Sequence, residues 1–154
     1  MGIFDFLKDV GDKITGADKR EAAEEQGMVV AIARHVIGLG LNPDGFRVEF
    51  DDGTATLHGN PTTQAERERV ILAVGNLNGV ARVDDRMVVR MPAPEAKFYT
   101  VQSGDSLSKI AREYYGDAMR YPEIFEANKP MLKDPDKIYP GQVLRIPLTV
   151  SPDA

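Results

Sequence analysis

The chain has 154 residues, no cysteine and a formal net charge of −5, from 24 Asp and Glu residues against 19 Lys and Arg residues. The absence of cysteine excludes disulfides and thiolate chemistry, and an acidic chain is a poor partner for nucleic acid because it repels the phosphate backbone. The longest wholly apolar run, MVVAIA at residues 28–33, is far shorter than the roughly 20 residues that cross a bilayer, so no membrane partner is expected.

The opening segment, MGIFDFLKDVG, carries apolar Ile3, Phe4, Leu7 and Val10 at helical spacing. It predicts a helix within residues 1–19 that packs against the domain that follows. The segment has no basic region or cleavage site of a signal peptide, and Phe6 stands where a myristoylation signal needs Ser or Thr. We therefore expect a cytoplasmic chain.

Residues 20–90 predict a first domain with the order α-β-β-α-β and two helices on one face of a small sheet. REAAEEQGMVVAIARHVIGLG has acidic residues early, an apolar stripe and terminal glycines, which is typical of a helix. In FRVEFDDGTATLHG, apolar and polar residues alternate on both sides of Asp-Asp-Gly, which predicts a β-hairpin. Thr63 and Glu66 form a capping box for a second helix that stops near Gly75, and ARVDDRMVVR predicts the last strand.

MPAPEAK, residues 91–97, predicts a linker because its two prolines remove backbone donors. Three segments within residues 98–147, YTVQSGDSLSKIA, IFEANKP and IYPGQVLRIP, resemble parts of a LysM domain. The resemblance implies a second domain of order β-α-α-β: the first segment gives a strand, a Gly-Asp turn and a helix start, the second gives the second helix, and the third gives a loop and closing strand. Residues 148–154 predict a tail. The predicted fold class is therefore α+β with two small domains.

No acid–base pair, nucleophile or cofactor motif stands out, so we do not expect an enzyme. Asp105 or Ser106 is expected to cap the first helix of the second domain. Asp84 and Asp85 are expected to be solvated charge at a strand edge, because the sequence places no third carboxylate nearby for a divalent metal. The tyrosines of the second domain are expected in its core: Tyr114, Tyr115, Tyr121 and Tyr139.

The sequence GNLNGV, residues 75–80, places two glycines and two asparagines directly after a helix. Such a segment can turn carbonyl oxygens inward, and a helix end leaves carbonyls without intrahelical partners. A cage of neutral carbonyl oxygens replaces the hydration shell of potassium, whereas several carboxylates favour calcium or magnesium. The same residues also suit an ordinary helix C-cap followed by a turn.

The hairpin, the capped helix and VGNLNGVARVDDRMVV resemble a BON domain, and residues 98–147 resemble a complete LysM domain. The whole chain resembles the bacterial BON–LysM potassium-binding family. This resemblance implies a cytoplasmic potassium binder. Because a bound ion stabilises the folded state, we expect a sensor or buffer that is compact with potassium and looser without it, and we expect a monomer. It also implies six main-chain carbonyl ligands for potassium: Leu7, Val10, Asp12, Gly75, Leu77 and Val80.

The LysM resemblance implies a groove that binds glycans such as peptidoglycan. Its expected residues lie on two loops: Gly104, Asp105, Ser106, Leu107, Ile138, Tyr139, Pro140 and Gly141. Two alternatives to potassium binding therefore stay open, a peptidoglycan-binding module and an intracellular adaptor whose groove binds a protein.

Overall fold

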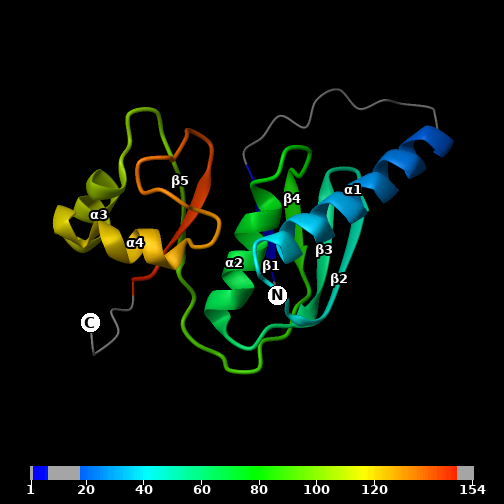
Figure 1. The fold of residues 1–154 in the computed structure, drawn as a ribbon, viewed down its shortest axis with the longest axis horizontal. Coiled ribbons are helices and arrows are strands. Elements are labelled where there is room, and N and C mark those ends of the chain that lie inside the picture. The colour runs from blue at the N-terminus through cyan, green and yellow to red at the C-terminus, as the bar shows by residue number, and fades with distance from the viewer. Residues whose placement is uncertain (1, 7–17, 149–154) are drawn as a thin grey trace. The chain divides into compact units, whose positions relative to one another are not determined.

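The computed structural model describes residues 2–6 and 18–148, and the chain divides into two compact units, Met1–Met91 and Pro92–Ala154. Both units combine helices and strands, which confirms the predicted α+β class (Figure 1). In the described part of the chain, no helix is long and apolar enough to cross a membrane. The elements of the first unit are β1 (Gly2–Asp5), α1 (Asp18–Gly38), β2 (Asp44–Asp51), β3 (Thr54–Asn60), α2 (Gln64–Gly75) and β4 (Arg82–Asp85).

The four strands of the first unit form one sheet in the order β1-β4-β3-β2. β4 runs parallel to β3 and antiparallel to β1, while β2 and β3 form the predicted antiparallel hairpin. One face of this sheet is buried: Val48, Ala55, Leu57 and Val83 are at most 7% exposed. α1 contacts β2 and α2 contacts β4, so the two helices share the core that these residues form.

The prediction of an opening helix is wrong for residues 2–6, because Gly2–Asp5 forms the edge strand β1. Phe4 pairs with Val83 and Phe6 is buried, whereas Ile3 is 61% exposed. The apolar pattern of these few residues therefore has the period of two that a half-buried strand requires. The remainder of the predicted helix, residues 7–17, lies outside the described residues.

The second helix of the first unit begins at the predicted capping box. The Thr63 hydroxyl accepts a hydrogen bond from Glu66 N at 3.1 Å, and the Glu66 carboxylate accepts one from Thr62 N at 2.8 Å. The helix ends at Gly75, as predicted. The last strand is shorter than expected, yet its parallel pairing continues as backbone hydrogen bonds from residues 86–91 to residues 57–62.

The second unit has the predicted β-α-α-β order, with a short 3-10 turn between the helices. Its elements are β5 (Lys97–Thr100), α3 (Leu107–Tyr115), η1 (Ala118–Arg120), α4 (Tyr121–Ala127) and β6 (Val143–Ile146). β5 and β6 pair antiparallel. Tyr114, Tyr115 and Tyr121 pack against the buried core, as expected. Tyr139 is 50% exposed, so its core assignment is wrong; it lies in a surface turn closed by the hydrogen bond from Gln142 N to its carbonyl.

Candidate functional site

Residues 75–80 form the connection between α2 and β4, which we call the α2–β4 turn. The helix ends at Gly75, and the Leu77 N–H still donates to the Val74 carbonyl at 3.1 Å. The Val80 N–H then donates to the Leu77 carbonyl at 3.2 Å, closing a turn in which Gly79 has a φ of +94°. A residue with a Cβ adopts that φ only with strain, so the glycine is required by the turn.

The end of β1 reaches this turn from the opposite end of the chain. Phe6 N donates to the Ala81 carbonyl at 2.8 Å, and the Phe6 side chain is 4% exposed. Its ring fills the space beside Gly75, where an added Cβ would lie 1.9 Å from Cζ of Phe6. The end of strand β1 therefore contacts the turn through Phe6, whereas the residues expected to bring carbonyls to it, Leu7, Val10 and Asp12, lie outside the described residues.

Two other segments, the tip of the β2–β3 hairpin and helix α1, also lie against residues 79–82. The Gly53 carbonyl, at the tip of the β2–β3 hairpin, accepts hydrogen bonds from Ala81 N at 2.9 Å and from Arg82 N at 3.1 Å. A Cβ on Gly79 would lie 3.3 Å from Cε of Met28, so α1 covers the turn as well. Elements from the whole first unit thus converge on residues 75–82.

The structure places three of the six expected potassium ligands, Gly75, Leu77 and Val80, in this one turn. The other three lie outside the described residues: Leu7, Val10 and Asp12. Among the residues that the structure describes, no group of three or more His, Asp or Glu side chains is placed to hold a metal ion.

The donor chemistry of the turn fits a weakly hydrated monovalent cation. The Leu77 carbonyl accepts a hydrogen bond from Val80 N, and a carbonyl oxygen has two lone pairs in all. Val80 is fully buried, which places its peptide group where water is restricted. Uncharged oxygens in such a place can replace the hydration shell of potassium, whereas magnesium gives up its water reluctantly.

A buried ion pair lies at the other end of β4, where the sequence predicted solvated charge. Asp85 has no exposed surface, and its carboxylate accepts from Arg67 Nε at 2.5 Å and from Met87 N at 2.9 Å. Gln64 and Glu68 of α2 are also buried and joined by a 2.9 Å hydrogen bond. The expectation for Asp85 is therefore wrong, because β4 turns this side chain toward α2 rather than toward solvent.

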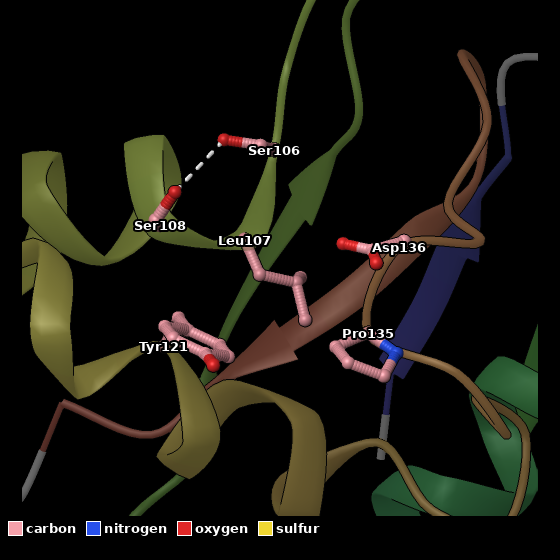
Figure 2. Close-up of a pocket in the computed structure, with 6 residues that line it drawn as sticks. All are labelled: Ser106, Leu107, Ser108, Tyr121, Pro135 and Asp136. Carbon is pink, nitrogen blue, oxygen red and sulfur yellow. Dashed lines mark hydrogen bonds between the residues drawn. The ribbon is translucent and has the colours of Figure 1, made fainter.

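The second unit contains a pocket of about 280 Å³ between the start of α3, the start of α4 and the loop before β6. Its lining combines three hydroxyls, one of them on an aromatic ring, with apolar side chains and one carboxylate: Ser106, Leu107, Ser108, Tyr121, Pro135 and Asp136. Figure 2 shows these side chains around the hollow, with the two serine hydroxyls hydrogen-bonded at 3.2 Å. The pocket is thus polar at its rim and apolar beneath.

Two of the expected groove residues, Ser106 and Leu107, line this pocket. The other six do not appear in its lining: Gly104, Asp105, Ile138, Tyr139, Pro140 and Gly141. Pro135 and Asp136 were missed because they lie in an irregular loop, where no periodicity indicates which side chains face inward.

The Gly-Asp turn beside the pocket is held by its own hydrogen bonds. Asp105 accepts from Gln102 N at 2.7 Å and from the Tyr99 hydroxyl at 2.5 Å, and this contact raises the pKa of Tyr99. Ser106 is the helix cap, since its hydroxyl accepts from Lys109 N at 3.2 Å. Of the two predicted caps, Ser106 is therefore the correct one.

The comparisons with known proteins agree with this division of the chain. Residues 30–91 match the BON domain and residues 99–147 match the LysM domain. The molecule is thus a two-domain protein with one domain of each kind.

A relative from Escherichia coli O6:H1, "Potassium binding protein Kbp", is 46% identical over 153 residues, covering 96% of this chain and 99% of the relative. The chain therefore belongs to the BON–LysM family of that protein. An uncharacterized protein of Deinococcus radiodurans is 59% identical over 49 residues, 32% of this chain and 19% of that protein. A solved structure described as CdsD of Chlamydia trachomatis shares 24% identity over 45% of this chain and 32% of its own, and its TM-score of 0.36 establishes no common fold.

Proposed function

We propose that this chain binds potassium through main-chain carbonyls of the α2–β4 turn. The observation that carries the proposal is the 46% identity, over nearly the full length of both chains, to a protein named for potassium binding. The neutral donor set of Gly75, Leu77 and Val80 agrees with it. The carbonyls of Leu7, Val10 and Asp12 remain the expected ligands from the opening segment.

Binding at this turn would link the ion to the stability of the first unit. The turn joins β1, α1, α2 and the hairpin, so an ion held there favours the docked arrangement of all four. A ligand at about 100 times its dissociation constant adds about 2.7 kcal/mol of stability. The protein would then act in the cytoplasm as a monomeric sensor or buffer, compact with potassium and looser without it.

The experiment is a calorimetric titration of the full chain with potassium, sodium and magnesium chlorides at fixed ionic strength. Potassium should give a saturable heat at concentrations where sodium and magnesium give little. X-ray scattering of the same samples should show a smaller radius of gyration with potassium. Equal responses to sodium and potassium would refute the proposal.

The pocket in the second unit supports glycan binding as a second candidate function. A sugar ring presents an apolar face and a rim of hydroxyls, which match the side chains of Leu107 and Pro135 and the polar groups of Ser108 and Asp136. The test is retention on purified peptidoglycan sacculi. Ser108→Arg should abolish retention by filling the pocket, and Ser103→Arg, at an exposed site outside the lining, should not.

A further inference from the structure

The conformation of the α2–β4 turn depends on one aromatic side chain from the other end of the sequence. An added Cβ at Gly75 would lie 1.9 Å from Cζ and 2.2 Å from both Cε atoms of Phe6. Given a bond of about 1.5 Å from Cα to Cβ, Cζ lies within about 3.4 Å of the Gly75 Cα. The ring therefore rests directly on the backbone of Gly75.

The backbone of the same residue fixes the far end of the turn. Phe6 N donates to the Ala81 carbonyl, while Ala81 N and Arg82 N donate to the Gly53 carbonyl. Phe6 thus contacts the first residue of the turn, Gly75, through its ring, and the residue that directly follows the turn, Ala81, through its N–H. Because the side chain is 4% exposed and packed on several sides, it has little room to move away.

We propose that Phe6 is a positioning residue that sets the spacing of the carbonyl oxygens in the α2–β4 turn and thereby the size of cation it prefers. This inference rests on the proposed potassium binding. A carbonyl cage discriminates between potassium and sodium by its size or by the number and field strength of its oxygens, and both depend on how firmly the peptide groups are held. A smaller or more pliable side chain at position 6 lets the Gly75 peptide move inward, toward the distance that sodium requires.

Phe4 supplies a matched control on the same strand. It pairs with Val83 and is half-buried on the same side of the sheet, but no Phe4 atom is among the nearest neighbours of Gly75. Replacing the buried Phe6 ring removes more packing than replacing the half-buried Phe4 ring, and only the change at Phe6 removes the contact with Gly75. The ratio of two affinities is therefore compared between the variants, rather than their stability.

The test compares Phe6→Met with Phe4→Met in the full chain, using potassium, rubidium and sodium chlorides as probes. Phe6→Met should lower the ratio of potassium to sodium affinity about tenfold, and Phe4→Met should leave the ratio within about twofold of the parent chain. In ion-free buffer, Phe6→Met should also shift the backbone amide signals of residues 75–80 more than Phe4→Met does. Should Phe6→Met fold poorly, Phe6→Leu with Phe4→Leu as its control provides the same comparison.

The outcomes separate this inference from the proposed function. A parent chain that does not distinguish potassium from sodium refutes potassium binding, and this inference with it. A parent chain that prefers potassium, with the same ratio in the Phe6 and Phe4 variants, leaves potassium binding intact and overturns the positioning role of Phe6. A merely structural Phe6 would lower stability and every affinity together without changing the ratio.

Discussion

The contact between Phe6 and Gly75 predicts that Gly75→Ala destabilises the first unit, although alanine is the better helix former. The new Cβ would lie 1.9 Å from the Phe6 ring, a distance that no packing adjustment of a few tenths of an ångström can relieve, so the ring must leave its site. Losing the burial of a phenylalanine costs about 1.5–3 kcal/mol, with a further cost for any cavity, while Gly→Ala in a helix returns about 0.5–1 kcal/mol. The expected net loss is about 1–3 kcal/mol.

The assay is urea unfolding of the full chain, followed by amide signals of the first unit, for Gly75→Ala, Phe6→Ala and the double variant. Once the ring is absent, Gly75→Ala should cost nothing or stabilise, so the double-mutant cycle should show strong coupling. Gly27→Ala, within α1 and with nothing within 4 Å of the added Cβ, should stabilise by about 0.5–1 kcal/mol. Equal costs of Gly75→Ala with and without the Phe6 ring would refute the reasoning.

Three further predictions concern other contacts. Asp85→Ala should destabilise the first unit by about 3–5 kcal/mol in urea unfolding, because it leaves the Arg67 charge without its buried partner. A loss below about 1 kcal/mol would contradict a stabilising role for this ion pair. Ser106→Ala should cost the second unit about 1 kcal/mol by removing the cap of α3, and an unchanged melting temperature would disprove this. The hydrogen bond to Asp105 raises the pKa of Tyr99 above its ordinary value of 10.0, so the neutral phenol stabilises the folded unit below that pH and this contribution is lost as the pH rises further. Tyr99→Phe should therefore reduce the free energy of unfolding at pH 7 by about 1 kcal/mol, and this free energy should fall less steeply above pH 10 than in the parent chain. Parallel curves of unfolding free energy against pH for the two chains would contradict this role of Tyr99.

The sequence was sufficient where the signals are local. The capping box of Thr63 and Glu66, the hairpin turn at Asp-Asp-Gly and the stop at Gly75 each depend on neighbouring residues, and the structure has all three. The order of elements in the second unit followed from the resemblance of residues 98–147 to a LysM domain, and the structure has that order.

Features that depend on distant pairing could not be read from the sequence. Gly2–Asp5 becomes a strand because β4 offers it an edge about 80 residues later, and four residues are too few to separate periods of two and 3.6. Asp85 is buried because its strand register aims it at Arg67 of α2. From the sequence alone, Phe6 served only to exclude a myristoylation signal. Among the described helical glycines, Gly75 is the one whose added Cβ would clash with an aromatic ring, that of Phe6.

In the proposed potassium site, the ligands Leu7, Val10 and Asp12 are implied by the family resemblance alone. Main-chain ligands leave no signature in side-chain type, since any residue carries the same carbonyl. The proposed ligands in the α2–β4 turn are better defined, because the positive φ of Gly79 and the hydrogen bond from Val80 N to the Leu77 carbonyl constrain the backbone there.

The central claim, that peptide oxygens of the α2–β4 turn bind potassium, is tested most directly by carbonyl carbon chemical shifts during a potassium titration at constant ionic strength. Saturable shifts are expected at Gly75, Leu77 and Val80 with potassium, and much smaller shifts at the same concentrations of sodium. Potassium-dependent shifts that leave these three carbonyls unmoved would contradict it.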